Sequence, residues 1–307
     1  SLNLKNGDLV HLTSKRGSIV APAQSTDELG IKQAFMAMHW GPGFISGRDH
    51  QNKALAGVNA ITTSAYCPTS KQPELKHAAV KILKAELPWK LLAMAWLPSD
   101  QSLTILQSLR ELMVQFEFAS CVPFAEDGAQ VERQGILFRA ASSEAPDMRL
   151  VHAIEALLQL DTLSGLRYAD PKRSHLRSIK LDRSKAFPQL EAFVMAGDTS
   201  AEAWLKTLLQ TQQSTESYGR RLLMTGDQPP VSLKSAGQTI CTCVGIKDVA
   251  IADWLQINPG KADFQLEGLK SNLKCGTQCG SCVPQLKRII ALKTPAPSKA
   301  STPSLAL

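Results

Sequence analysis

The sequence predicts a multidomain α+β protein, and three observations carry that prediction. Residues 1–88 contain short apolar runs separated by turns rich in glycine and proline, which is typical of β structure. Residues 89–232 mix strand-like and helix-like runs, which favours an α+β spacer domain. Residues 236–292 combine two close pairs of cysteines with helically spaced apolar residues, so a small helical domain around a metal centre is expected there.

The first segment is expected to begin with a β-hairpin. Residues 8–13 alternate partly between apolar and polar side chains, Lys15-Arg16-Gly17 forms a turn, and residues 18–23 return as a second strand. His39 and Trp40 follow in a loop that contains too much glycine and proline to be regular. Such a pair is more often packed in a loop than catalytic, so no catalytic residue is predicted here.

The spacer segment predicts alternating strands and helices but no chemistry. A buried strand is expected at 91–97, and a helix is expected from the polar pair Ser99-Asp100 to about Gln115. Further along the chain we expect strands near 118 and at 135–140, a helix at 150–160, a meander over 166–170, 176–181 and 190–195, and an amphipathic helix at 200–211. Residues 227–237 are expected to be a linker. The tail, residues 293–307, is rich in proline, serine and alanine and is expected to be disordered.

Four cysteines in two close pairs are the most informative feature of the chain. Cys241 and Cys243 form a C-x-C pair, and Cys279 and Cys282 form a C-x-x-C pair. A zinc ribbon uses two C-x-x-C turns, and C-x-C is tighter than that. Four thiolates around two irons and two sulfides make a 2Fe–2S cluster, which carries one electron. The spacing therefore favours an iron–sulfur cluster over zinc.

The residues around these cysteines predict three helices. Apolar residues at helical spacing follow the first pair at 247–255, and a second helix is expected at 264–273. Pro284 suits the first position of a third helix, where its missing N–H has no cost. The second pair then lies in a loop that enters a helix N-terminus, where the helix dipole favours negative charge. Gly276 and Gly280 let the backbone approach the sulfides.

Composition places the chain in a reducing compartment. Most of its seven cysteines are clustered, which favours a metal site over a disulfide framework. The best apolar run, 91–97, is too short to cross a bilayer, and no secretion signal opens the chain, so we expect a cytoplasmic protein. The net charge of +7 is dispersed, without a nucleic-acid motif, and fits solvated faces or the docking of an acidic electron-transfer partner.

The cysteine region resembles the bacterioferritin-associated-ferredoxin-like (BFD-like) 2Fe–2S domain, a small helical module at the ends of several reductases. The resemblance covers about residues 236–292 and rests on Cys241-Thr-Cys243-Val-Gly-Ile and on Lys274-Cys-Gly-Thr-Gln-Cys-Gly-Ser-Cys-Val-Pro284. It implies that the cluster ligands are Cys241, Cys243, Cys279 and Cys282. From spacing alone Cys275 could replace Cys279, whereas the resemblance implies a thiol beside the cluster or a spare one. Cys67 and Cys121 are isolated, and an isolated cysteine is usually a small buried hydrophobe.

The first segment resembles the C-terminal molybdopterin-dinucleotide-binding domain of molybdenum oxidoreductases. The ordered match consists of Leu4-Lys-Asn-Gly-Asp-Leu-Val, Ser14-Lys-Arg-Gly, His39-Trp-Gly, Asn59 and Gln72-Pro-Glu-Leu-Lys76. The resemblance implies a six-stranded double-psi β-barrel, incomplete here because the chain is expected to begin after its first strand. It also implies that Asn59 and Lys76 contact the pterin cofactor, since an amide can recognise a pterin or guanine edge and a lysine can meet a phosphate. Taken alone, Asn59 would be a turn residue and Lys76 a solvated one.

The two modules in this order resemble the C-terminal part of bacterial assimilatory nitrate reductase catalytic subunits. The resemblance implies reduction of nitrate to nitrite at Mo-bis(molybdopterin guanine dinucleotide), with a 4Fe–4S cluster in a missing N-terminal part. It further implies a flavoprotein reductase subunit, a ferredoxin or a flavodoxin as the electron donor, with no nucleic-acid or membrane partner. The chain is expected to be a C-terminal fragment, inactive alone.

Three alternatives remain. A formate dehydrogenase or another molybdopterin oxidoreductase would share the first module. A free-standing ferredoxin would share only residues 236–292, and the preceding 235 residues argue against it. A zinc-binding interaction module is the alternative from a different class, and metal analysis distinguishes it.

Overall fold

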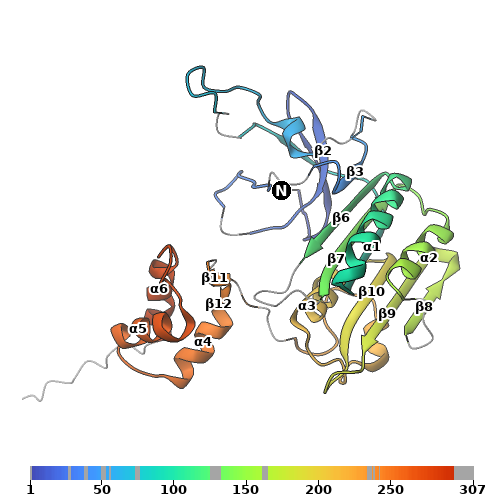
Figure 1. Cartoon of the computed structure of the whole chain (residues 1–307). Coiled ribbons are helices and arrows are strands. Elements are labelled where there is room, and N and C mark those ends of the chain that lie inside the picture. Colours follow the sequence, from blue (N-terminus) through green and yellow to red (C-terminus); the bar gives the residue numbers. More distant parts are fainter. Residues whose placement is uncertain are drawn as a thin grey trace, which may run out of the picture. The chain divides into compact units, whose positions relative to one another are not determined.

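The computed structural model describes residues 2–26, 29–37, 41–49, 53–54, 57–72, 77–124, 133–160, 165–233, 237, 239–241 and 243–293. The chain forms two compact units, Ser1–Leu233 and Lys234–Leu307 (Figure 1). His39, Trp40, Lys76 and the residues of the expected tail from 294 onward lie outside the described residues.

A small antiparallel sheet opens the first unit. Its strand order is β2-β1-β4, with β1 at Leu9–Thr13, β2 at Ser18–Pro22 and β4 at Lys81–Lys84. The predicted hairpin of β1 and β2 is confirmed, since Leu9 pairs with Pro22 and Thr13 pairs with Ser18. The described residues of this sheet form three strands, and the six-stranded barrel stays a prediction. A short 3-10 helix, η1 (Val58–Ile61), packs its apolar residues on the same core.

A larger antiparallel sheet follows, with the order β3-β6-β7-β5-β10-β9-β8. The strands are β3 (Ile45–Gly47), β5 (Trp89–Pro98), β6 (Phe118–Phe124), β7 (Arg133–Ser142), β8 (Leu166–Asp170), β9 (His175–Asp182) and β10 (Gln189–Gly197). Strand β5 lies at the centre and is almost wholly buried, as the apolar run 91–97 predicted. Because β3 pairs with β6, the segment before residue 88 contributes to this sheet. The domain boundary at 88/89 stays a prediction.

Helices cover both faces of this sheet (Figure 1). One face packs on α1 (Ser99–Leu112) and α2 (Met148–Leu157), and the other packs on α3 (Glu202–Thr211) and η4 (Gly219–Leu223). Short 3-10 turns are η2 (Met113–Gln115) and η3 (Pro171–Arg173). The side chains of β5 alternate between these faces, so Leu91 faces one core and Leu92 faces the other. Burying a leucine side chain fully contributes roughly 1.5–3 kcal/mol, so the buried leucines of β5 stabilise the packing of the helices on both faces of the sheet.

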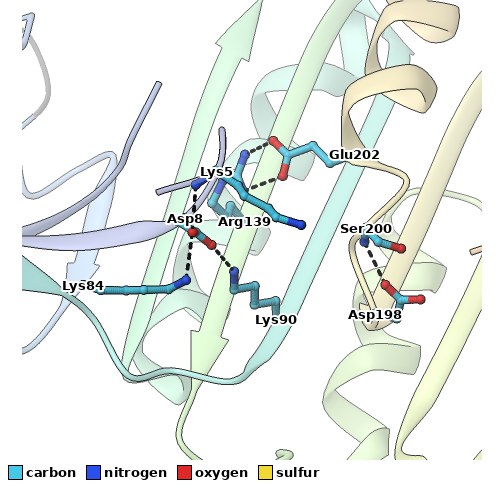
Figure 2. A network of polar contacts seen from close by, with 8 residues as sticks. All are labelled: Lys5, Asp8, Lys84, Lys90, Arg139, Asp198, Ser200 and Glu202. Atoms are coloured by element: carbon cyan, nitrogen blue, oxygen red, sulfur yellow. Dashed lines mark hydrogen bonds and ion pairs between the residues drawn. The ribbon is translucent and has the colours of Figure 1, made fainter. Parts of the chain in front are cut away.

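A network of charges ties Asp8, the residue before β1, to strands β4 and β5 (Figure 2). The Asp8 carboxylate accepts hydrogen bonds from the Lys5 backbone N–H at 3.0 Å, Lys84 Nζ at 2.9 Å and Lys90 Nζ at 3.1 Å. Burial alone would raise the pKa of Asp8, but the N–H of Lys5 and the two ammonium groups outweigh it and hold that pKa well below its usual range. These bonds therefore stabilise the fold at neutral pH and are lost only in strong acid.

A second ion pair lies next to this network, where both terminal guanidinium nitrogens of Arg139 in β7 donate to the Glu202 carboxylate (Figure 2). Gly7 packs against this carboxylate. Its φ is +89°, and a Cβ at Gly7 would lie 2.8 Å from Glu202 Oε2. Only glycine adopts this conformation and leaves this space free. The chain before β1 is thus held against the first turn of α3.

The second unit is small and helical, as predicted. It contains β11 (Thr239–Cys241), β12 (Ile246–Lys247), α4 (Asp248–Ile257), α5 (Ala262–Leu273) and α6 (Val283–Lys293). Its core includes Ile251, Leu269 and Leu286, none of which exposes measurable surface. Helix α6 begins at Val283, so Pro284 stands second rather than first, still within the turn whose N–H groups lack helical partners. No helix among the described residues of the whole chain is long and apolar enough to span a membrane.

Candidate functional site

Five cysteines gather in the second unit. Cys241 ends β11 and Cys243 lies in the following turn. Cys275 follows the C-terminus of α5, whereas Cys279 and Cys282 lie in the loop that leads into α6. The structure thus brings together residues that are about 40 positions apart in the sequence, as the predicted ligand set requires.

The four predicted ligands form two contacting pairs. Cys243 and Cys279 are exposed, and their Sγ atoms lie 3.1 Å apart. Cys241 and Cys282 are buried and hydrogen-bond to each other. One pair therefore faces solvent, and the other belongs to the core of the unit.

Backbone N–H groups surround the buried pair. The N–H of Gly276 donates to both Cys241 and Cys282, and the N–H of Val244 also donates to Cys241. Gly276 has a φ of +74°, and a Cβ there would lie 2.7 Å from Cγ2 of Val283. Glycine is needed at this point for the N–H to reach the two sulfurs. Such donors stabilise negative charge on sulfur.

The pKa values of the thiols are shifted in opposite directions within each pair. The hydroxyl and N–H of Ser281 lower the pKa of Cys279 to about 7, and the hydrogen bond to Cys279 raises the pKa of Cys243. Burial raises the pKa of Cys282. Burial also acts to raise the pKa of Cys241, but the N–H of Gly276 and other donors outweigh burial, so the pKa of Cys241 is lowered. Within each pair, one thiol therefore ionises more easily than the other. Metal binding must release the remaining protons.

This donor set fits a two-iron cluster. A 2Fe–2S cluster divides four thiolates between two irons, and its negative charge suits N–H donors and a helix N-terminus. When bound, such a cluster supplies one-electron transfer.

The remaining cysteines differ from one another. Cys275 is fully buried and contacts Cys241, so the geometry alone leaves it beside the ligands. Cys121 is buried in β6, and burial raises its pKa to about 12, as expected for an inert core thiol. The expectation of burial is wrong for Cys67, which is exposed in a turn and whose Sγ accepts the Ser70 N–H at 3.5 Å. The exposure of Cys67 goes with the turn at 68–70, which the residue type alone does not reveal.

The predicted pterin contacts are only partly visible. Asn59 lies exposed in η1, while Lys76 is outside the described residues. The β1–β2 turn packs against η1, because a Cβ on Gly17 would lie 2.9 Å from the Ala60 carbonyl oxygen. Arg16 in that turn reaches the Thr63 hydroxyl at 3.4 Å. The exposed Arg16 therefore lies in a turn that packs against η1, the element that carries Asn59, and the basic turn Lys15-Arg16-Gly17 marks it in the sequence.

Comparison with known proteins defines the two modules. Residues 1–79 match the molydopterin dinucleotide binding domain, and residues 239–291 match the BFD-like [2Fe-2S] binding domain. The chain therefore carries a site for a molybdopterin dinucleotide and a site for a 2Fe–2S cluster. No solved structure matches the chain significantly.

Nitrate reductases are among the chain's relatives. A nitrate reductase of Klebsiella oxytoca is 24% identical over 295 residues, which cover 95% of this chain and 29% of that protein. A nitrate reductase of Symbiobacterium thermophilum is 39% identical over 88 residues, 27% of this chain and 10% of that protein. An F420-dependent formate dehydrogenase subunit alpha of Methanocaldococcus jannaschii is 38% identical over 82 residues, which cover 27% of this chain and 10% of that protein. The chain spans less than a third of the length of these relatives.

Proposed function

We propose that the chain is the C-terminal part of a molybdenum-dependent assimilatory nitrate reductase, which reduces nitrate to nitrite. The observation that carries this proposal is the extent of the match. Similarity to the Klebsiella oxytoca nitrate reductase runs through 95% of the chain, so it includes the spacer as well as both modules. The formate dehydrogenase match covers 27% of the chain. A formate dehydrogenase or another molybdopterin oxidoreductase is therefore the second candidate.

In this proposal the first unit holds part of the molybdenum cofactor, Mo-bis(molybdopterin guanine dinucleotide). The small sheet β2-β1-β4 would belong to a double-psi β-barrel that is incomplete in this chain. Asn59 would recognise a ring edge of the dinucleotide, while Lys76 and Arg16 would meet its phosphates. Asn59 and Arg16 are both exposed, and the turn that carries Arg16 packs against η1, which supports this assignment.

The second unit would receive electrons for the molybdenum centre. Its proposed ligands are Cys241, Cys243, Cys279 and Cys282, of which Cys243 and Cys279 are exposed. Because this pair of ligands is exposed, a flavoprotein reductase subunit, a ferredoxin or a flavodoxin could approach the cluster on that side. The net charge of +7 favours acidic partners of this kind in the cytoplasm.

The full-length enzyme tests the choice of substrate. Purified under anaerobic conditions and supplied with reduced viologen, it is expected to form nitrite from nitrate. Supplied with formate and an oxidised dye, it is expected to leave the dye oxidised. The opposite pattern would replace the nitrate proposal with the formate one. Inactivity on both substrates, with molybdenum bound, would contradict both.

The assignment of Asn59 and Lys76 makes a separate prediction. Asn59→Ala and Lys76→Ala in the full-length enzyme are expected to lower molybdenum content and nitrate reduction together. For Lys76, a hydrogen bond between charged groups contributes about 1.5–3 kcal/mol, which corresponds to at least tenfold weaker cofactor binding. For Asn59, a neutral hydrogen bond contributes about 0.5–1.5 kcal/mol, so a smaller loss is expected. Thermal stability of the Asn59→Ala apoprotein should change little, because Asn59 is exposed and exposed substitutions usually cost within about 0.5 kcal/mol.

Lys185→Ala is the matched control for the lysine variant, since it removes the same charge from an exposed loop of the spacer. It should leave molybdenum content unchanged. Normal molybdenum content and activity in both Asn59→Ala and Lys76→Ala would contradict the assignment.

A further inference from the structure

The fifth cysteine of the second unit, Cys275, is held in a fixed position by the end of α5. It lies between Lys274, with a φ of +57°, and Gly276, with a φ of +74°, and its N–H donates to the Leu269 carbonyl at 3.3 Å. This arrangement caps the helix and turns the chain toward the core. The Cys275 side chain exposes no surface.

The Cys275 thiol faces the buried pair of proposed ligands. It is hydrogen-bonded to Cys241 and lies near Cys282, within the same apolar cluster. The exposed pair has a different neighbour, because the hydroxyl of Ser281 lies 3.1 Å from Cys279 Sγ. Each pair of sulfurs therefore has one side-chain donor, an S–H group in the core and an O–H group at the surface.

We propose that Cys275 is a positioning residue whose S–H donates a hydrogen bond to Cys241 Sγ and raises the reduction potential of the 2Fe–2S cluster. The inference rests on the proposed ligand set. Reduction adds one electron, and part of the added negative charge falls on the ligand sulfurs. A donor aimed at such a sulfur stabilises the reduced form, and hydrogen bonds to the sulfurs are one determinant of these potentials.

Burial explains why a weak donor has a measurable effect here. An S–H group is a poor donor in water, where solvent competes for the same sulfur. In the core the effective dielectric constant is low and water is excluded, so the same bond is stronger. The backbone N–H groups of Gly276 and Val244 already donate to Cys241, and the Cys275 thiol adds a side-chain donor.

The experiment uses the 307-residue chain, which offers one cluster site, after reconstitution with iron and sulfide. Iron and sulfide content, and redox titration followed by electron paramagnetic resonance, are measured for wild type, Cys275→Ala and Cys275→Ser. The control is Ser271→Ala, which changes a residue on the exposed surface of α5. All four are expected to bind the same iron and sulfide. Cys275→Ala is expected to lower the reduction potential by up to about 59 mV, which corresponds to a tenfold weaker affinity of the cluster for one electron. Cys275→Ser keeps a donor and should stay at or above the wild-type potential, and Ser271→Ala should match wild type.

Three results would overturn the inference. Equal potentials in wild type, Cys275→Ala and Cys275→Ser would show that the thiol only fills space. Loss of iron from Cys275→Ala and Cys275→Ser, but not from Cys279→Ala, would make Cys275 a ligand. A wild-type chain that takes up no iron and sulfide would overturn the ligand set itself, and that failure is distinguishable because it appears before any variant is compared. If Cys275→Ala does not fold, the sign of the shift in Cys275→Ser decides: a potential below wild type contradicts the donor role.

Discussion

Replacing Cys241, Cys243, Cys279 or Cys282 by serine is expected to remove nearly all iron and visible colour from the chain. The wild-type chain should carry about two irons, held by four thiolates. Serine is nearly isosteric but a much poorer ligand for iron. Loss at the buried positions, Cys241 and Cys282, should also destabilise the second unit, because metal binding energy contributes directly to the folding of small metal domains. Iron analysis and thermal unfolding followed by circular dichroism measure the two effects.

Cys67→Ser is the control, since it also removes an exposed thiol but lies in the other unit. It should keep the full iron content. Stoichiometric zinc in the anaerobically purified wild type, without charge-transfer bands, would instead favour the zinc-binding interaction module. Retention of the cluster in any of the four serine variants would remove that cysteine from the ligand set.

Loss of the cluster is expected to separate two activities of the full-length enzyme. In Cys243→Ser, nitrate reduction driven by the physiological donor should be almost completely lost, because the proposed route for electrons begins at the exposed pair Cys243 and Cys279. Reduced viologen is small enough to reach the interior centres directly, so nitrate reduction with viologen should persist. Steady-state rates with each donor, at measured molybdenum content, give the comparison.

The control Ser271→Ala, in the same unit, should retain both activities. If both activities fell together in Cys243→Ser while molybdenum content stayed normal, the cluster would be holding the fold rather than receiving electrons. If the variant kept full activity with the physiological donor, the electron route would have to begin elsewhere.

Local patterns predicted those parts of the fold that depend on neighbouring residues. The apolar run at 91–97 predicted the central strand β5, and helical spacing predicted α4 and α5 to within a few residues. The motifs that resemble the BFD-like domain predicted four ligands, and the structure brings these four cysteines together. In each case the signal is a period or a motif contained within one segment.

Long-range contacts could not be predicted in this way. Nothing near Ile45 indicates that it pairs with Ser120 in β6, and nothing near Gly7 indicates that Glu202 lies against it. The exposure of Cys67 depends on a turn, and the position of Cys275 beside Cys241 depends on the way α5 ends. These features follow from tertiary packing, which a single sequence read along its length does not contain.

The large sheet includes β3 from the cofactor-binding segment, and the residues around Gly7 contact the first turn of α3. Both features have a consequence for the way the first unit unfolds. Strand β3 cannot leave β6 without opening the edge of the large sheet, and the β1 hairpin cannot detach without exposing the charges of Asp8, Arg139 and Glu202. Partial opening would therefore separate the Asp8 carboxylate from Lys90 and uncover the Arg139–Glu202 pair, and the loss of these partly buried ion pairs disfavours a half-open state. The cofactor-binding segment and the spacer should accordingly unfold in one cooperative transition, so heat or denaturant that releases the molybdenum cofactor should melt the large sheet at the same point.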